Sequence, residues 1–299
     1  MLTVPDTFAK VSFYGTYAFL VTTGTITFIE ALRTNVSAVR HILNLETCIS
    51  IVAAYFYSKF VKELEDAEKS SGGGIGGGVG SEGFQSEYTI EGDDGSGEGK
   101  GTIVGGISAS GSDGEGRGGG GKWRGRSGGK IPPALYSQLN ETRYTDWMIT
   151  TPIMLLVLCL AFQYNNTLAG GLGKTGGVPM GVSFVLFAWV LLMNWGMIGS
   201  GYLAEVGRIS KRDGLVFGFL FFFVLYALLY FGFLHGSKGN AYFQNMFLFL
   251  VFFVLWSIYG IVYWFEDEAL KNTSYNVLDL LSKCFVGIFF WAYFTGVFV

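Results

Sequence analysis

The sequence predicts an all-α fold, a seven-transmembrane-helix bundle with a long disordered glycine-rich loop between helices 2 and 3. The first observation is composition: 50% of the 299 residues are hydrophobic and only 14% are charged, which is typical of membrane proteins. The second is that the apolar residues gather in windows of about twenty, each able to cross ~30 Å of hydrocarbon. Because lipid offers no partners to backbone polar groups, such windows form helices. The net charge of −3 is too small to indicate a nucleic-acid partner.

Seven such windows follow one another, with short connections except for one long interruption. They are Val11–Leu32, Ile42–Val61, Leu135–Phe162, Val178–Tyr202, Gly214–Phe233, Ala241–Phe265 and Ser274–Phe298. Short connections make consecutive helices antiparallel neighbours. The sequence therefore predicts a multi-pass integral membrane protein in contact with lipid. Four glycosylation sequons are explained as chance matches: Asn35, Asn140, Asn165 and Asn272.

The long interruption separates the second window from the third. Residues 63–130 hold more than half of the chain's 45 glycines and almost no large apolar residues. Such a segment cannot bury enough surface to offset the entropy of ordering it. We therefore expect transmembrane helices 1 and 2 in residues 1–62, a disordered insert in 63–130, and helices 3 to 7 in 131–299. All seven helices form one domain.

The seventh window carries two ionisable residues, Asp279 and Lys283, four positions apart. This spacing places them on one face of a helix. A charged group at membrane depth is costly and usually faces a partner inside the protein. One interpretation is a structural ion pair whose lysine reaches the membrane surface. The other is a buried amine that forms a Schiff base with a carbonyl compound, beside its counter-ion.

The third window begins with a second pair of opposite charges. Arg143 and Asp146 are three residues apart, and Thr150 lies one turn beyond Asp146. This pattern indicates a polar face directed at the bundle axis. Thr150 and Thr151 precede Pro152, so their hydroxyls can bond a carboxylate or the carbonyls that the proline leaves free. A helix-end ion pair with a proline kink is the alternative.

An aromatic stripe marks the sixth window. Trp256, Tyr259 and Tyr263 recur at helical spacing, which is typical either of core packing or of a wall around a cofactor. Gly260 lies beside the stripe and would leave room for a bulky ligand.

The second window contains a carboxylate, Glu46, inside an apolar run. A carboxylate at this depth indicates an ion path. Ser12 and Asn276 are polar residues on two other predicted helices and would extend the path. The alternative for Glu46 is an interfacial carboxylate near Arg40 and His41.

Together, these motifs resemble the microbial, retinal-binding rhodopsins. The residues that carry the resemblance are Arg143, Tyr144, Asp146, Trp147, Thr150, Thr151 and Pro152 in the third window, Trp256 and Tyr259 in the sixth, and Asp279 and Lys283 in the seventh. The end of the fourth window, GYLAEVG, resembles the proteorhodopsin branch. The second window, with its ETCIS stretch, resembles the viral rhodopsins of the channel-forming group.

The resemblance implies a role for each motif. Lys283 would carry all-trans retinal as a protonated Schiff base. Asp146 and Asp279 would be its counter-ions, with Arg143 towards the extracellular side. The implied retinal-binding residues are Lys283, Trp147, Thr151, Met154, Asn194, Trp256 and Tyr259, with Thr151 and Asn194 paired across two helices. The family topology places the N-terminus and the insert outside the cell. No metal and no enzymatic activity are implied, and homo-oligomers are common in the family.

Three functions stay open. Proton pumps of this family carry a carboxylate donor eleven residues after the first counter-ion, where this chain has Val157. A light-gated cation channel, with Ser12, Glu46 and Asn276 in the ion path, is therefore the preferred hypothesis. The alternatives are an outward proton pump without the usual donor and a photosensor that signals through a partner. A transporter with a buried lysine–aspartate pair is the reading outside this family.

Overall fold

The computed structural model describes residues 6–72, 132–170 and 182–295. The helices are α1 (Asp6–Arg33), α2 (Ser37–Gly72), α3 (Pro133–Ala169), α4 (Phe184–Glu205), α5 (Lys211–Leu229), α6 (Gly239–Tyr263), α7 (Glu268–Asp279) and α8 (Val286–Thr295). A π-helical turn, η1 (Tyr230–Leu234), continues α5, and another, η2 (Leu280–Phe285), joins α7 to α8. The described residues thus form seven helical rods and no strand, which confirms the predicted fold class.

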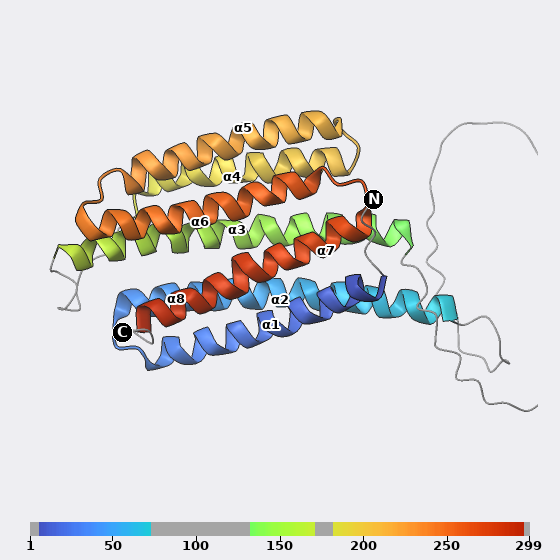
Figure 1. The fold of residues 1–299 in the computed structure, drawn as a ribbon, viewed down its shortest axis with the longest axis horizontal. Helices are drawn as coiled ribbons and strands as arrows, with labels where there is room; N and C mark the ends of the chain where they lie inside the picture. Colours follow the sequence, from blue (N-terminus) through green and yellow to red (C-terminus); the bar gives the residue numbers. More distant parts are fainter. Residues whose placement is uncertain (1–5, 73–131, 171–181, 296–299) are drawn as a thin grey trace, which may run out of the picture. The chain divides into compact units, whose positions relative to one another are not determined.

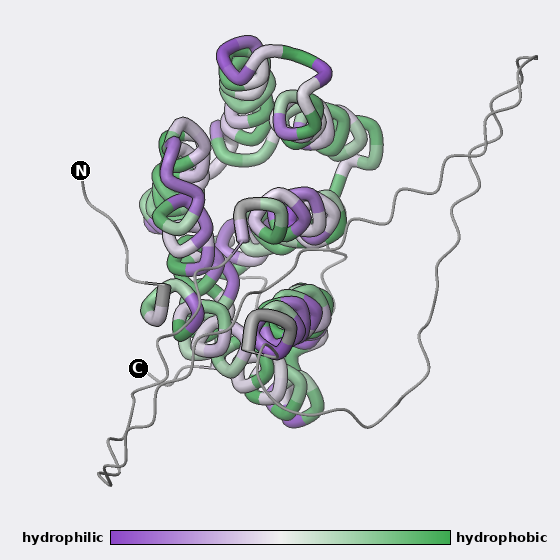
Figure 2. The backbone as a smooth tube through the Cα atoms, turned by 90° about the vertical axis from the view of Figure 1, so that its right-hand side faces the viewer, coloured by the Kyte–Doolittle hydropathy of each residue, from purple (hydrophilic) through white to green (hydrophobic). Residues whose placement is uncertain are grey.

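The rods lie side by side in a closed bundle (Figure 1). Each helix packs against the next along the chain, and the last rod returns to α1. The view along the rods in Figure 2 shows them around a common interior. α3 contacts α2, α4, α6 and α7, so its inner face meets groups from most of the bundle. This position explains why the third window carries the longest motif.

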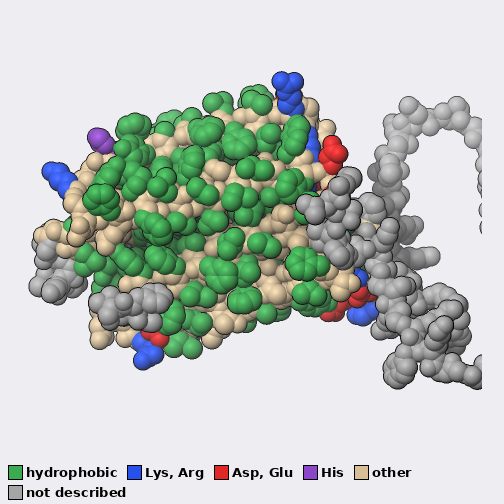
Figure 3. Space-filling model, in the orientation of Figure 1, with side chains coloured by type: hydrophobic (Ala, Val, Ile, Leu, Met, Phe, Trp, Pro, Cys, Tyr) green, Lys and Arg blue, Asp and Glu red, His purple; other side chains and the backbone are tan. Residues whose placement is uncertain are grey.

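The outward surface is apolar. In Figure 3 hydrophobic side chains cover most of the face shown, and charged groups gather towards its ends. Within the described residues, five helical rods are long and apolar enough to cross a membrane, namely α3, α4, α5 with η1, α6, and α7 through α8. α1 and α2 also belong to the bundle, but they carry more polar residues. The chain is a multi-pass integral membrane protein.

The second helix is longer than its apolar window. It continues to Gly72, so residues 63–72 are helical and the predicted boundary of the insert at residue 63 is wrong. Leu64 keeps the apolar face of the helix buried, and the hydroxyl of Tyr14 on α1 donates a hydrogen bond to Glu65 at 3.1 Å. The rest of the predicted insert, residues 73–130, lies outside the described residues, as do 178–181 of the fourth window and 296–298 of the seventh.

Candidate functional site

Lys283 lies in the centre of the bundle, in the π-helical turn η2. It is only 2% exposed, and its Nζ lies 2.6 Å from Asp146 Oδ2 on α3 and 3.6 Å from Asp279 Oδ1 one turn earlier. Both carboxylates are fully buried. A lysine that reached the membrane surface would have no such partners, so this geometry rules out that alternative. π-helical turns frequently mark functional positions, and this one surrounds the lysine.

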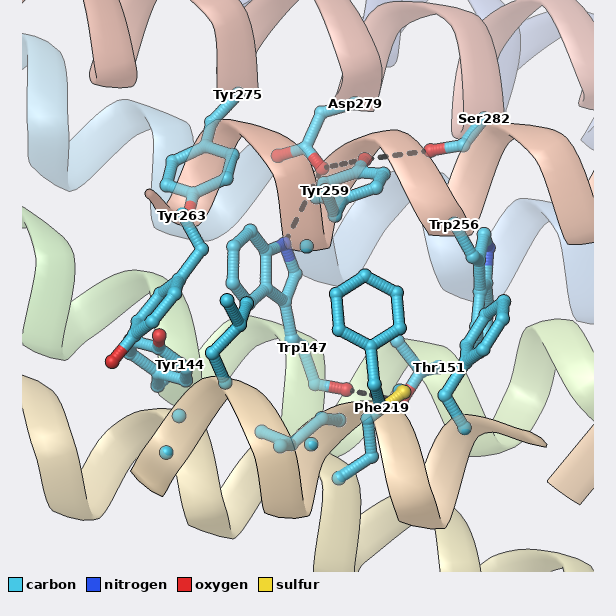
Figure 4. Close-up of a pocket in the computed structure, with 18 of the residues that line it drawn as sticks. Tyr144, Trp147, Thr151, Phe219, Trp256, Tyr259, Tyr263, Tyr275, Asp279 and Ser282 are labelled. Atoms are coloured by element: carbon cyan, nitrogen blue, oxygen red, sulfur yellow. Dashed lines mark hydrogen bonds between the residues drawn. The ribbon is translucent and has the colours of Figure 1, made fainter. Parts of the chain in front are cut away.

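Asp279 is held by donors from three other helices. Its Oδ2 accepts hydrogen bonds from Tyr57 Oη at 2.8 Å and Arg143 Nη1 at 3.2 Å. Its Oδ1 accepts from Tyr259 Oη at 2.7 Å and Trp147 Nε1 at 3.3 Å. Figure 4 shows the bonds from Trp147 and Tyr259 at the wall of the central cavity. Because four donors surround it, Asp279 is stabilised as a fixed anion.

Asp146 has a different environment. Its Oδ2 contacts Lys283, whereas its Oδ1 has no hydrogen-bond partner among the described residues. Of the two kinds of acceptor expected for the hydroxyl of Thr150, a carboxylate or a carbonyl freed by the proline, it uses neither: Thr150 Oγ1 donates to the backbone carbonyl of Asp146, four residues earlier, at 2.9 Å. Asp146 therefore has spare acceptor capacity and is the better placed of the two carboxylates to receive a proton.

Arg143 occupies an aromatic and amide cage next to Asp279. Its guanidinium carbon lies 5.2–5.8 Å from four ring centroids, those of Phe13, Tyr57, Phe60 and Tyr275, at cation–π distance. Its Nη2 donates to Asn276 Oδ1 at 2.7 Å and to Asn272 Oδ1 at 3.5 Å. The cage fixes a cation beside the lysine–carboxylate centre.

A polar chain continues from Arg143 towards the end of the bundle where α7 begins. Asn272 Nδ2 donates to Asn140 Oδ1 at 3.0 Å, and Asn140 Nδ2 donates to Glu205 at 2.6 Å and Glu268 at 2.9 Å. Lys271 forms ion pairs with both glutamates, at 3.1 and 3.3 Å. The sequons at Asn140 and Asn272 are therefore buried structural amides, 2% and 0% exposed.

Next to Lys283 is a large cavity, with about 800 Å³ of empty space including its open side. Six of the predicted retinal-binding residues line it: Lys283, Trp147, Thr151, Met154, Trp256 and Tyr259. Most of the other lining residues are apolar or aromatic. Gly260 also lines the cavity, as the sequence led us to expect, and the ring of Phe219, another lining residue, would lie 2.7 Å from a Cβ added to the glycine.

Asn194 does not line the cavity but supports it from behind. Its Nδ2 donates to Thr151 Oγ1 at 2.8 Å, which is the predicted pairing of the two helices. Thr151 in turn donates to the carbonyl of Trp147 at 2.7 Å. The carbonyl of Met148, which Pro152 leaves without its helical donor, accepts from Trp195 Nε1 at 3.2 Å.

The three predicted ion-path residues fall into two places. Ser12 and Asn276 meet, with Asn276 Nδ2 donating to Ser12 Oγ at 2.8 Å. Glu46 lies elsewhere, at the level of Gly287 on the last rod. Gly287 is about three turns further along that rod than Asn276, a rise of roughly 16 Å at ~1.5 Å per residue. Glu46 is 2% exposed, so it is not the interfacial carboxylate that was the alternative. Lys283 lies between the two places.

Sequence reasoning missed several members of the site. Tyr57 bonds Asp279, yet in sequence it is one of three aromatic residues in a row, with nothing to distinguish it. Asn140 and Asn272 were dismissed with the sequons. A helical count back from Asp279 places Asn272 on its face, and this signal could have identified it.

The fold and site define a seven-helix membrane protein with a buried lysine, two carboxylates and an aromatic cavity. The family model for bacteriorhodopsin-like proteins matches residues 7–297, and the chain belongs to this family. The chain is similar to the viral rhodopsin OLPVRII, with 41% identity and a TM-score of 0.66, over 97% of this chain and 99% of that one. Members of the family generally bind retinal through a lysine Schiff base.

More distant relatives agree with this assignment. The crystal structure of Acetabularia rhodopsin I is 17% identical, with a TM-score of 0.60 over 98% of this chain and 97% of that one, and shows the same fold. Opsin-1 of Neurospora crassa is 30% identical over 164 residues, which are 50% of this chain and 47% of that protein. The opsin-like protein carO of Fusarium fujikuroi is 25% identical over 171 residues. The chain spans about half the length of the curated relatives it matches.

Proposed function

We propose that Lys283 carries all-trans retinal as a protonated Schiff base and that the chain is a light-gated cation channel. The fit of retinal is supported by the apolar cavity that ends at the amine of Lys283 and by the unpaired Oδ1 of Asp146 beside it. When bound, retinal supplies light absorption and a change of shape. The 2.6 Å contact with Lys283 supports Asp146 as the acceptor of the Lys283 proton.

The observation that carries the channel proposal is a polar seam along the inner faces of α1 and α2. On α1, Ser12, Thr16, Thr23 and Thr27 recur at helical spacing, and the three threonines are 0–3% exposed. On α2, Glu46, Thr47 and Ser50 face them, 0–5% exposed. Buried polar groups in a membrane bundle usually line a pathway for ions or water.

Two hydroxyls in this seam are not satisfied by nitrogen or oxygen atoms of the described residues. The hydroxyls of Thr23 and Ser50 have no hydrogen-bond partner from nitrogen or oxygen in the described part of the chain. Buried polar atoms without partners are natural sites for water. Leu20, fully buried between Thr16 and Thr23 on α1, interrupts the seam in this closed arrangement. Movement of a proton from Lys283 to Asp146 changes the charges next to the seam and would bias it towards opening.

The bundle also supports the expected orientation. The beginning of α1 and the end of α2 lie at the same end as Arg143, since Ser12 bonds Asn276 and Gln138 bonds Glu63. If Arg143 lies towards the extracellular side, as the family topology implies, the N-terminus and both ends of the insert are extracellular as well. Proteolysis of the insert in intact cells tests this orientation.

Whole-cell photocurrent against membrane voltage, with retinal supplied, tests the channel. The expected result is light-evoked current whose sign reverses with voltage. Lys283→Ala abolishes it, whereas Lys59→Ala, which removes an exposed lysine of α2, leaves it in place. Current of one sign at all voltages would contradict the proposal.

A light-driven proton pump is the second candidate, favoured by the hydrogen-bonded chain from Asp279 through Arg143 to the glutamates near Lys271. This chain offers a continuous route for a proton away from the centre. A pump predicts that illuminated cells acidify their medium and that Asp146→Asn stops the acidification.

A further inference from the structure

The central cavity has a polar end that the proposed function leaves unexplained. Three tyrosines line the cavity there: Tyr144 on α3, Tyr263 on α6 and Tyr275 on α7, which are 6%, 6% and 3% exposed. Figure 4 shows all three on one side of Trp147, with Trp256 on the other. We call the part of the cavity lined by the three tyrosines the tyrosine end.

Two glycines leave space for hydroxyls at the tyrosine end. A Cβ added to Gly201 on α4 would lie 2.9 Å from Tyr144 Oη, and one added to Gly214 on α5 would lie 3.1 Å from Tyr263 Oη. Both hydroxyls therefore lie against the wall that α4 and α5 form. A side chain at either glycine would crowd them, so this end of the cavity depends on glycine at both positions.

The three hydroxyls have no partner in the described part of the protein. No hydrogen bond from the described residues reaches the hydroxyl of Tyr144, Tyr263 or Tyr275. A buried tyrosine hydroxyl usually has a partner, because burial without one is costly. Glu205, at the same end of the bundle, accepts from Asn140 instead, at 2.6 Å. The missing partner therefore has to come from a molecule inside the cavity.

α4 and α5 form the wall of the cavity opposite the rod that carries Lys283 (Figure 4). On this wall Gly201 lies one turn from Met197 along α4, and Gly214 lies one turn from Gly218 along α5. Both steps lead towards the tyrosine end, and each is a rise of about 5.4 Å. A chromophore that is attached to Lys283 and extends to this wall therefore has its far end about one helical turn from the tyrosine hydroxyls.

The chemistry of the tyrosine end does not match unmodified retinal. Retinal is a hydrocarbon at the end remote from its aldehyde, so it would leave the phenol groups facing apolar carbon. A hydroxyl group on the ring both donates and accepts hydrogen bonds, as phenols do. We propose that the tyrosine end selects a retinal whose ring carries a hydroxyl group, with Tyr144, Tyr263 and Tyr275 as its hydrogen-bonding partners. This inference rests on the proposed attachment of retinal to Lys283 but not on whether the protein is a channel or a pump.

The size of the selection follows from the number of hydrogen bonds. A site that bonds a hydroxyl group is left with unpaired polar groups when the ligand lacks that hydroxyl. Each net hydrogen bond contributes a factor of about three, and a hydroxyl that donates one and accepts one gains about 10-fold in affinity. Water trapped at the tyrosine end would bond the same phenol groups, but it would not select between the two chromophores.

Competition between chromophores tests the selection. The full chain, prepared in lipid without chromophore, receives an equimolar excess of all-trans retinal and all-trans 3-hydroxyretinal, and in a second series 4-hydroxyretinal replaces the 3-hydroxy compound. The bound chromophore is then released with hydroxylamine and identified by chromatography. We expect one of the two hydroxylated compounds to be enriched about 10-fold over retinal. Equal uptake in both series would overturn the proposal and leave water as the partner of the tyrosines.

Two variants locate the selection. Tyr263→Phe should still take up retinal, but the enrichment of the hydroxylated compound should fall to about threefold or less. Tyr202→Phe is the matched control and should keep the full enrichment. The ring of Tyr202 lies 5.9 Å from that of Tyr144, yet Tyr202 is 37% exposed and does not line the cavity. Full enrichment in Tyr263→Phe would overturn the assignment to the tyrosine end.

Failure of the proposed function gives a different result. A chain that forms no visible absorption band with any of the three chromophores would refute the attachment of retinal to Lys283, and this inference with it. A band that forms without enrichment would refute the selection alone. Photocurrent enters neither experiment, so failure of the channel proposal is recognised separately.

Discussion

Tyr57 offers the sharpest test of the central hydrogen-bond network, because its hydroxyl is shared by three helices. It is fully buried and lies 2.8 Å from Asp279 Oδ2, 3.0 Å from Asn276 Oδ1 and 3.0 Å from Arg143 Nη1. Tyr57→Phe removes only this oxygen. The anion and the cation beside it then each lose a partner, while the aromatic packing of the ring against Phe13 and Phe60 stays in place.

The expected cost follows from the kind of bond. Hydrogen bonds between membrane helices average ~0.6 kcal/mol with a maximum of ~1.7, and bonds to charged groups reach ~1.5–3 kcal/mol. Because Tyr57 contacts both Asp279 and Arg143, we expect Tyr57→Phe to lower the free energy of unfolding by about 2 kcal/mol. Tyr55→Phe alters a tyrosine on the same helix that is 56% exposed and whose hydroxyl bonds none of the described residues, so it should stay within about 0.5 kcal/mol.

Unfolding by SDS in mixed micelles measures these differences. A double-mutant cycle of Tyr57→Phe with Asp279→Asn should give a coupling of about 1 kcal/mol, since the two side chains are in direct contact. The reasoning is refuted if Tyr57→Phe costs no more than Tyr55→Phe, or if the two changes add to within ~0.3 kcal/mol.

Two further predictions concern the packing of α4. Gly214→Ala should lower the free energy of unfolding by about 1–3 kcal/mol, because the added Cβ would lie 2.6 Å from that of Ala204. The control is Gly199→Ala, whose added Cβ has nothing within 4 Å, so it should be neutral or stabilising when unfolding by SDS is measured. Thr151→Val should lower the free energy of unfolding by about 1 kcal/mol more than Asn194→Leu does. Thr151→Val leaves the buried amide of Asn194 without its acceptor, whereas Asn194→Leu removes that amide together with its unpaired Oδ1. Equal costs within either pair would contradict these accounts.

The motifs of the third and seventh helices were readable from sequence because their spacing alone fixes which residues share a face. Asp279 and Lys283, or Arg143 and Asp146, need only a helix to become neighbours. The apolar windows predicted the transmembrane helices, because the thickness of the hydrocarbon layer sets their length and lipid permits only helices in such segments. The Thr151–Asn194 pairing came from the family resemblance, and the structure contains it.

Tertiary structure decided what spacing does not encode. The end of α2 lay beyond its apolar window because contacts with α1, such as that of Tyr14 with Glu65, hold polar turns as helix. The ring of Phe219 from α5 came to lie against Gly260 at the cavity wall. Tyr57 joined the site, and Glu46 separated from Ser12 and Asn276, because such distances depend on how the rods are rotated and shifted against each other.

The sequence by itself therefore determined that this protein is a seven-helix membrane bundle, and its motifs indicated the rhodopsin family and a centre of Lys283 and two aspartates. Only the tertiary structure decided which carboxylate accepts several hydrogen bonds, which has an unpaired oxygen, and which is buried away from every charged side chain of the described residues. The physical reason is that periodicity fixes the direction of side chains on one helix, whereas satisfaction of a buried charge depends on groups brought from several helices at once.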